Sequence, residues 1–220
     1  MTANEGKRPA PGSRERMVRA MGRLLRRQGY AATGLQQVAR EARAPIGSMY
    51  FYFPDGKEQL AAEAVARSGG DLGGRLDALL GASDVPAAVR AIAGAMGEDL
   101  VRSRWMNGCP IATAALERAA DSEPIRSAAS AVFDQWELVF FERMCADGIA
   151  ADRARRIASL VVAALEGAIL LARTRRSLDP LREVAGQVAE WIAAETARVG
   201  AADSSPPASG RPSRRSTRRT

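Results

Sequence analysis

The sequence contains no histidine, and that absence removes several kinds of catalysis. A Ser-His-Asp triad and a Cys-His pair both need an imidazole, and most zinc sites use one as a ligand. The two cysteines, Cys109 and Cys145, are too few for a disulfide framework or a cysteine-only metal site. We therefore expect no metal, no other cofactor and no catalytic residue.

Long hydrophobic runs are also scarce. The most apolar run, residues 157–172, is shorter than the roughly 20 residues that a membrane span needs, and it contains Glu166. The N-terminal residues are polar and rich in proline and glycine, unlike a secretory signal. No stretch alternates with the period of a strand over a useful length. The sequence therefore predicts an all-α, soluble and cytoplasmic protein that does not associate with a membrane.

Charge is distributed unevenly along the chain, whose formal net charge is +7. The first 60 residues hold 11 basic and 5 acidic side chains, residues 61–199 hold 16 and 19, and residues 200–220 hold 5 and 1. A basic N-terminal part on a slightly acidic body is typical of a nucleic-acid-binding head. Because codon bias can also make an arginine-rich chain basic, charge alone does not decide the function.

The rest of the chain is organised around residues 34–57, which carry two short helical patterns. In the first pattern, apolar residues at the spacing i, i+3, i+4 and i+7 form one stripe: Leu35, Val38, Ala39 and Ala42. In the second, Pro45 can open a helix at its first position, and Met49 and Phe53 face inward. Because only two residues separate the patterns, the helices must cross at a sharp turn. This arrangement is a helix-turn-helix, whose second helix enters the DNA major groove.

The outward face of that second helix is expected to meet DNA. Its residues are Ile46, Gly47, Ser48, Tyr50, Phe51 and Tyr52. Small residues at Gly47 and Ser48 let the backbone approach a base edge, and tyrosine hydroxyls on the flank can reach phosphates.

This run resembles the DNA-binding segment of the TetR family of one-component repressors. The resemblance is carried by residues at the family's spacing: Thr33, Ala39, Ala42, Gly47, Ser48, Tyr50, Phe53 and Lys57. The chain departs from the family at Arg43, where a turn glycine is usual, at Pro45, where a Ser or Thr cap is usual, and at Tyr52, where a histidine is usual. Together with residues 32–35 (ATGL) and 108–110 (GCP), these departures resemble one branch, the LmrA/YxaF-like regulators.

The resemblance implies a repressor that binds a palindromic, double-stranded DNA operator. Thr33 is expected to cap the helix that follows it and, as in the family, to face a phosphate. The expected DNA-contacting residues are Thr33, Gln37, Pro45, Ile46, Gly47, Ser48, Tyr50, Phe51, Tyr52 and Lys57.

Four segments are expected along the chain. Residues 1–12 form a disordered arm, and residues 13–58 form a three-helix helix-turn-helix domain. Residues 59–199 form a larger helical domain for ligand binding and dimerisation. Residues 200–220 form a disordered basic tail, which either adds salt-sensitive DNA affinity or only aids solubility.

Two glycine pairs lie inside the long helix that begins at Lys57, namely Gly69-Gly70 and Gly73-Gly74. Glycine inside a helix costs about 1 kcal/mol relative to alanine, so four in one helix need a reason. A hinge that transmits motion and close helix packing are equally good explanations.

Aromatic residues make up only 5% of the chain, yet several gather with sulfur-containing residues between residues 96 and 140. Such a stripe is more often plain core than a pocket. The resemblance favours a cavity instead, because TetR-like bodies enclose one and this branch is associated with aromatic, largely apolar ligands. The expected lining is Met96, Leu100, Trp105, Met106, Cys109, Phe133, Trp136 and Phe140, with Glu166 as a polar partner. Cys109 is expected to be a buried structural thiol rather than a redox sensor.

The last two helices carry faces of small and large apolar residues that suit close packing, within the body or between two chains. TetR-like proteins dimerise through these helices, and a helix-turn-helix dimer reads two half-sites. The expected homodimer interface is Ala158, Val161, Ala164, Leu165, Ala168, Leu171, Val188 and Trp191.

The leading hypothesis is a homodimeric repressor that leaves its operator when a small apolar effector binds the body. A DNA-binding dimer without ligand control is the first alternative, because a filled core and a cavity share one residue pattern. An all-α enzyme is the least favoured, since Glu166 is its only obvious acid or base.

Overall fold

The computed structural model describes residues 12–203, with side chains described up to Val199. This part of the chain contains helices and no strand, as the sequence predicts. The expected arm and tail lie almost wholly outside it. The helices are α1 (Ser13–Gln28), α2 (Leu35–Glu41), α3 (Gly47–Tyr52), α4 (Gly56–Ala82), α5 (Val85–Arg102), α6 (Pro110–Arg118), α7 (Glu123–Ala146), α8 (Ala151–Arg175) and α9 (Asp179–Asp203).

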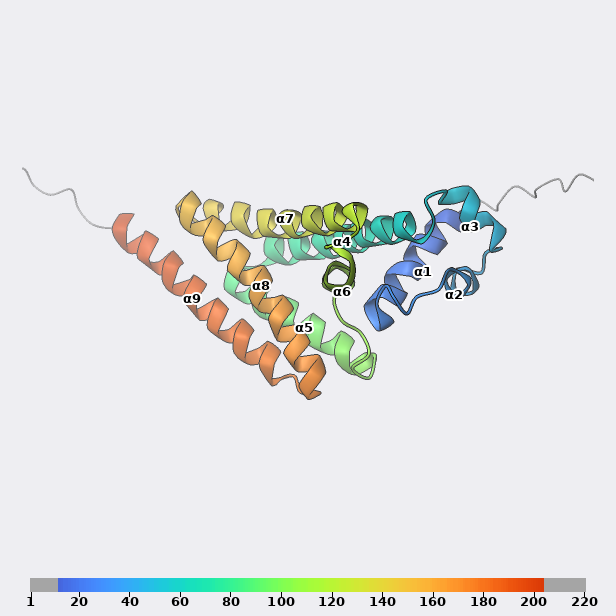
Figure 1. The fold of residues 1–220 in the computed structure, drawn as a ribbon. Coiled ribbons are helices and arrows are strands. Elements are labelled where there is room, and N and C mark those ends of the chain that lie inside the picture. Colours follow the sequence, from blue (N-terminus) through green and yellow to red (C-terminus); the bar gives the residue numbers. More distant parts are fainter. Residues whose placement is uncertain (1–11, 204–220) are drawn as a thin grey trace, which may run out of the picture.

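Helices α1, α2 and α3 form a head at one end of the elongated molecule, and α4 leads from the head into the body (Figure 1). The predicted inward residues of the helix-turn-helix are buried against α1 and the start of α4. This head core comprises Met17, Met21, Leu24, Val38, Met49, Phe53 and Leu60. The packing fixes α3 on the outside of the head, where a DNA groove can reach it.

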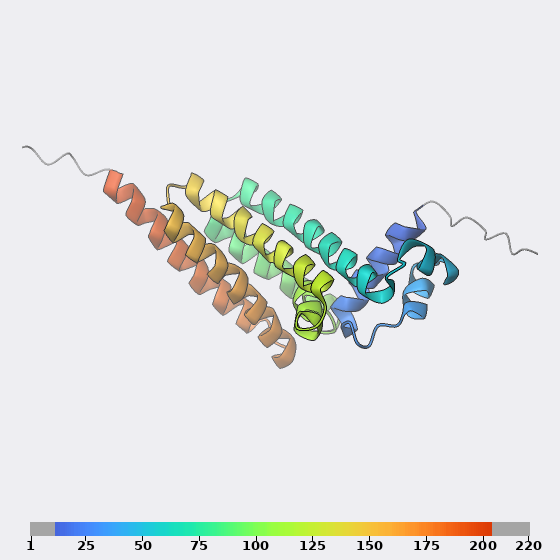
Figure 2. The ribbon, with the colours of Figure 1, turned by 45° about the horizontal axis from the view of Figure 1, so that its top comes forward.

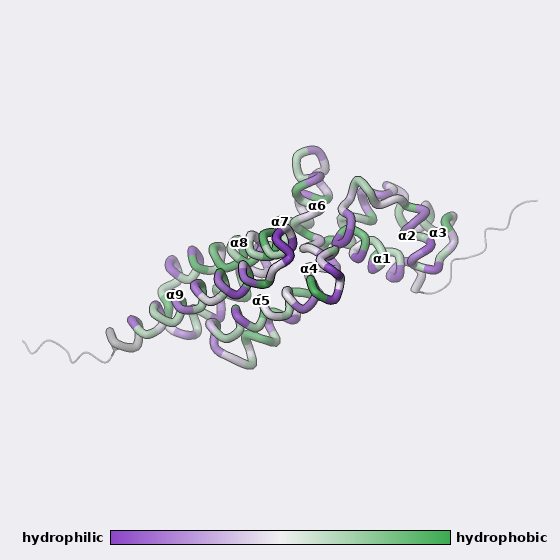
Figure 3. Tube along the Cα trace, turned by 90° about the horizontal axis from the view of Figure 1, so that it is seen from below, coloured by the Kyte–Doolittle hydropathy of each residue, from purple (hydrophilic) through white to green (hydrophobic). Residues whose placement is uncertain are grey.

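The body consists of long helices that run side by side (Figure 2). Helix α4 packs along α7, α7 along α8, and α9 along both α5 and α8. Helix α6 is short and lies where the head meets the body, and it projects there in the view from below (Figure 3). Because α6 contacts α1 as well as α4 and α7, it bridges the head and the body.

The turn between α2 and α3 depends on an arginine in a conformation that favours glycine. Arg43 has φ 48°, in the left-handed region, at the position where the family has its turn glycine. The N–H of Ala44 then donates to the carbonyl of Ala39 at 3.0 Å, which closes α2. Arg16 Nε donates to the carbonyl of Ala42 at 2.9 Å and ties the same turn to α1. These bonds offset a left-handed cost of about 1–2 kcal/mol.

The glycines of α4 mark close packing on one side of a continuous helix. A Cβ on Gly69 would lie 2.2 Å from Val132 Cγ2, so α7 approaches α4 too closely there for any side chain. Gly73 faces α7 as well, whereas Gly70 and Gly74 face open space. Close packing therefore accounts for Gly69, and a hinge at this point stays a prediction.

One helix in the described part, α8, has the length and apolar character of a membrane span, with 25 residues. The sequence expectation that this run is too short considered only residues 157–172. One side of α8 is buried against α7 and α9 in this chain, with Ala158, Val161 and Leu165 in the core. The core helix of a soluble protein has this same composition.

Candidate DNA-binding surface and ligand cavity

Helix α3, the predicted recognition helix, begins later than the sequence predicts. Its first residue is Gly47 and its N-cap is Ile46, so Pro45 precedes the helix instead of opening it. The backbone is nonetheless already turning, because the N–H of Ser48 donates to the carbonyl of Pro45 at 3.0 Å. The expectation that Pro45 occupies the first helical position is therefore wrong, although Pro45 still sets the entry into α3.

The outer face of α3 exposes large apolar side chains that no part of the described chain covers. Ile46, Tyr50 and Phe51 are 41%, 63% and 69% exposed. A Cβ built on Gly47 meets nothing within 4 Å, so the backbone at this position is open to a partner. Exposed apolar groups gathered on one short helix indicate a binding surface.

Two residues predicted on this face point elsewhere. Ser48 is buried, at 7% exposure, so its hydroxyl is not available to a base edge. Tyr52 is half-buried, and its ring packs edge-on against Phe51 and Phe53. The placement of Ser48 on the outward face was wrong, because Ser48 lies beside the buried Met49 in this short helix and is buried with it.

Thr33 does not cap α2. Its Oγ1 donates to the carbonyl of Gly29 at 2.6 Å, and the residue is buried, so the hydroxyl closes the α1–α2 turn. The N-cap of α2 is Gly34, which has no side chain to offer. Gln37 is half-buried and exchanges hydrogen bonds with Gln28, its Oε1 accepting at 3.0 Å.

Lys57 lies at the junction of head and body. Its Nζ is 4.1 Å from the centroid of the Tyr30 ring. Loss of solvent around the ammonium lowers the pKa of Lys57, and the nearby Glu117 opposes that shift. Its expected phosphate contact stays a prediction.

The sequence prediction missed three exposed residues, namely Gln36 and Arg40 of α2 and Arg43 of the α2–α3 turn. With Pro45 and Ile46 they line an open hollow on the surface between the two helices. Within residues 12–199, neither Arg40 nor Arg43 pairs with an acid, so both guanidinium groups are free for phosphates. The spacing of Gln36 and Arg40, four residues apart on the outer side of α2, was the available signal.

The body contains a partly open cavity of about 270 Å³ between α4, α5, α7 and α8. Five of the predicted residues line it, namely Met96, Cys109, Trp136, Phe140 and Glu166. The sequence missed the apolar walls that other helices contribute: Leu72, Leu76, Leu79, Ile92, Val162 and Ile169. It also missed the charged residues at the opening: Arg26, Arg75, Glu98, Asp99 and Arg102.

Four predicted residues do not line this cavity. Leu100 is fully packed in the core, and Met106 is exposed on the α5–α6 loop. Trp105 is half-buried on that loop and has a left-handed backbone, with φ 65°. Phe133 packs edge-to-face on Trp136, with ring centroids 5.7 Å apart, and lines a second hollow of about 450 Å³. Cys109 and Glu166 border both hollows and so separate them.

Glu166 is the unusual group of this wall. Its Oε2 is buried and has no hydrogen-bond partner in the described part of the chain. Burial raises the pKa of the Glu166 carboxyl, and a hydrogen bond with the Cys109 thiol opposes the shift only partly. Burial and the neighbouring carboxylate also raise the pKa of the Cys109 thiol, which therefore stays protonated and unreactive. The geometry favours the structural thiol over the redox sensor.

The raised pKa of Glu166 predicts a pH-dependent stability. Between the ordinary carboxyl value of 4.5 and the raised value, the folded protein holds a proton that the unfolded chain has lost. Stability therefore falls as pH rises through this range. Glu166→Gln should raise the melting temperature near neutral pH, with the gain shrinking toward about pH 4. Calorimetry of this variant beside Glu142→Gln, an exposed control on α7, measures the effect. A gain that did not vary with pH would show that ionisation is not the cause.

The dimer interface stays a prediction, although five of its expected members are already buried within this chain: Ala158, Val161, Leu165, Ala168 and Val188. Ala164 and Trp191 are half-buried, and only Leu171 is exposed. The opposite side of α8 is uncovered and equally apolar, with Leu160, Ala163, Gly167, Leu170 and Leu171. Both sides of this helix are apolar, so periodicity alone does not tell which one faces the core.

Comparison with known proteins identifies the family. Residues 19–64 match the tetR family of bacterial regulatory proteins, and residues 86–187 match the C-terminal domain of LmrA/YxaF-like transcriptional regulators. An HTH-type transcriptional regulator of Mycobacterium tuberculosis is 38% identical over 189 residues, covering 84% of this chain and 96% of that protein. The HTH-type transcriptional regulator YxaF of Bacillus subtilis is 34% identical over 177 residues, covering 80% and 93%. The chain belongs to the TetR family of transcriptional regulators, in its LmrA/YxaF-like branch.

Solved structures agree on the fold. A cysteine mutant of the TetR-family regulator CifR, complexed with 26-bp double-stranded operator DNA, matches with a TM-score of 0.67 at 24% identity. The match covers 85% of this chain and 98% of that one. The predicted fold class, an N-terminal helix-turn-helix on a larger helical body, is confirmed.

Proposed function

We propose that this regulator is a cytoplasmic repressor that binds a palindromic DNA operator as a homodimer. A small, largely apolar ligand in the body cavity releases it. The observation that carries the proposal is that one chain has both an uncovered α3 face and a mainly apolar cavity in its body. The first provides a surface for DNA, and the second provides a site whose occupancy can alter that surface.

The DNA half of the proposal rests on the exposed face of the head. Tyr50 and Phe51 project from α3, and Gly47 leaves room for close approach to a base edge. Arg40 and Arg43 lie beside them on the α2 side, where guanidinium groups bind phosphates and fix the register. CifR, which shares this fold, was solved in complex with operator DNA.

The ligand half rests on the cavity. Its walls are mainly apolar and aromatic, and Glu166 presents one buried oxygen without a partner. Such a site favours a flat apolar molecule held by stacking and by one hydrogen-bond donor. A dimer that binds DNA without ligand control is the alternative, and it predicts that an occupied cavity leaves DNA affinity unchanged. Enzymatic use of the pocket has no support from the relatives, which are named as regulators.

Trp136 offers an optical test of the cavity. It lines the cavity, and its Nε1 donates to the carbonyl of Gly69 at 3.0 Å. Truncation to alanine would open the α4–α7 contact, so Trp136→Phe is the better variant. We expect 2-naphthol, a flat aromatic with one hydroxyl, to quench tryptophan fluorescence, and Trp136→Phe to lose most of that quenching. Trp191→Phe on α9, outside the cavity, is the matched control and should retain it.

The same titration separates the proposal from its alternative. DNA is first selected by the wild-type protein from a randomised duplex library, and its affinity is then measured with and without 2-naphthol. Ligand control predicts an affinity loss of about 5- to 150-fold when the cavity is filled. Quenching with unchanged DNA affinity would favour the dimer without ligand control. Absence of any selected duplex would contradict the DNA half itself.

A further inference from the structure

Helix α6 connects the cavity wall to the DNA-binding head. Its N-cap Cys109 and first residue Pro110 line the cavity. Its last turn, nine residues later, reaches the connection between α1 and α2. A straight helix of that length spans about 13 Å and is stiff along its axis.

The head end of α6 holds the α1–α2 turn by two bonds to one carboxylate. The N–H of Tyr30 donates to Glu117 Oε1 at 3.1 Å, and the N–H of Ala31 donates to Oε2 at 2.7 Å. Within residues 12–203 these two N–H groups have no other acceptor. Tyr30 and Ala31 belong to the connection between α1 and α2. Glu117 therefore binds the main chain directly before the helix-turn-helix.

The turn is shaped around this carboxylate. Gly29 has φ +81°, a left-handed conformation, and a Cβ at this position would overlap Glu117 Oε1. The Tyr30 ring lies under two cations, with Lys57 Nζ at 4.1 Å and Arg118 Cζ at 5.0 Å from its centroid. Arg118 follows Glu117 in α6, and Lys57 lies in the first turn of α4. Cations from both helices therefore contact Tyr30 in the α1–α2 turn.

The cavity end of α6 is hydrogen-bonded to the last turn of α1, which directly precedes the turn that Glu117 contacts. The N–H of Gly108 donates to the carbonyl of Arg26 at 3.0 Å. The guanidinium of Arg26 lies 3.5 Å from Asp99 on α5, and both residues border the cavity. The last turn of α1 and the connection after it are thus attached to α6 at both of its ends.

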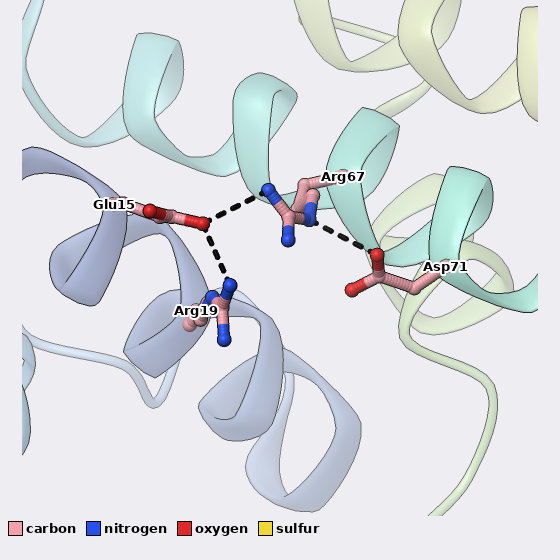
Figure 4. Close-up of polar contacts among 4 residues, drawn as sticks. All are labelled: Glu15, Arg19, Arg67 and Asp71. Atoms are coloured by element: carbon pink, nitrogen blue, oxygen red, sulfur yellow. Dashed lines mark hydrogen bonds and ion pairs between the residues drawn. The ribbon is translucent and has the colours of Figure 1, made fainter.

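A second set of contacts joins head and body nearer the start of α1, and it differs in kind. Glu15 accepts from Arg19 at 2.7 Å and from Arg67 at 3.2 Å, and Arg67 also pairs with Asp71 (Figure 4). These are exposed ion pairs between long side chains, which contribute little because both partners lose rotamer freedom. Glu117 instead binds backbone N–H groups, which restrains the position of the main chain itself.

We propose that Glu117 is a positioning residue for operator binding. The proposal rests on the proposed function only in taking the head to bind DNA, and it is argued from the contacts of Glu117. By accepting from the N–H groups of Tyr30 and Ala31, Glu117 fixes the turn that leads into α2 and α3.

Glu117→Gln tests, without any ligand, whether Glu117 positions the α1–α2 turn. The new amide group would face one of the two backbone N–H groups, donor against donor. Hydrogen exchange of the Tyr30 and Ala31 amides should accelerate by about tenfold, as expected when one hydrogen bond is lost. Glu15→Gln is the matched control, because it removes the same charge from the same junction. It should leave both amides protected. Unchanged protection in Glu117→Gln would overturn the proposal.

The sign of the DNA effect separates positioning from charge. Removing a carboxylate should leave non-specific DNA binding unchanged or strengthen it. Positioning predicts the opposite for the selected duplex, a loss of about 5- to 150-fold, comparable to one misread base pair. We expect that loss in Glu117→Gln and not in Glu15→Gln, with the melting temperature of both close to wild type. Equal behaviour of the two variants would show that Glu117 does not position the head.

A wild type that selects no duplex would contradict the proposed function, and the amide protection of Tyr30 and Ala31 would still decide whether Glu117 holds the turn.

Discussion

Gly47→Glu should abolish specific operator binding and leave the fold intact. Gly47 opens α3 on the exposed face of the head, and a Cβ there meets nothing within 4 Å. The glutamate therefore has room in the free protein, and the variant should melt close to the wild type. In the complex, its carboxylate would lie where α3 meets the DNA, whose phosphates repel it. We expect affinity for the selected duplex to fall to the non-specific level, about 10³-fold or more.

Two control variants separate bulk, charge and position. Gly47→Ala adds only a methyl group, so a large effect from it would indicate that the backbone itself contacts a base edge. Gly70→Glu adds the same charge at another open helical glycine, on α4 in the body, and should cost far less. Fluorescence anisotropy with the labelled duplex measures all three variants. Wild-type affinity in Gly47→Glu would show that α3 is not the recognition helix.

The sequence predicts the layout of this protein well because the helices are amphipathic and clearly punctuated. Apolar spacing marks α2 through Val38 and Ala39, and glycine, proline and capping residues mark the ends of most other helices. The helix-turn-helix was found for the same reason. Ser48 and Thr33 were misplaced because a small hydroxyl suits a cap, a buried turn or a DNA contact equally, and only the packing decides.

The cavity shows a different limit. Trp136 and Phe140 stand out as rare aromatics, whereas Leu76 and Ile92 resemble any core residue of an amphipathic helix. Which leucines border a hollow depends on how α4, α5, α7 and α8 cross, and no single helix contains that information. Close approach of α7 at Gly69 sets part of that geometry. Glycine pairs inside a helix predict that a crossing exists without telling which helix crosses.

The contacts of Glu117 with the α1–α2 turn could not be predicted from the sequence, because they are long-range contacts made by an ordinary residue. A glutamate in the last turn of a short helix normally reads as solvated. Its partners are backbone N–H groups 86 and 87 positions away in the sequence. The only local signal is Gly29, a helix-terminating glycine that also has to leave space for the carboxylate.

Ala163→Arg should convert the proposed dimer to monomers and weaken binding of a two-half-site duplex by about 10²- to 10⁴-fold. Ala163 lies on the uncovered side of α8, between Leu160 and Gly167. Arginine at Ala168, on the buried side of α8, would disrupt the body instead, because that residue is only 1% exposed. In a two-fold symmetric dimer the arginine enters the interface twice, so bulk and like charge oppose association from both sides.

The expected loss of DNA affinity is opposite in sign to the effect of the added positive charge, so the two causes can be told apart. An added arginine should strengthen DNA binding by any chain that binds as a monomer. Ala66→Arg, on the exposed side of α4, is the matched control and should stay dimeric with equal or higher affinity. Sedimentation at micromolar concentration gives the oligomeric state, and circular dichroism checks that the helices remain. A variant that still sedimented as a dimer would exclude this side of α8 as the interface. A wild-type monomer would refute the dimer, and with it the reading of a palindrome by two heads.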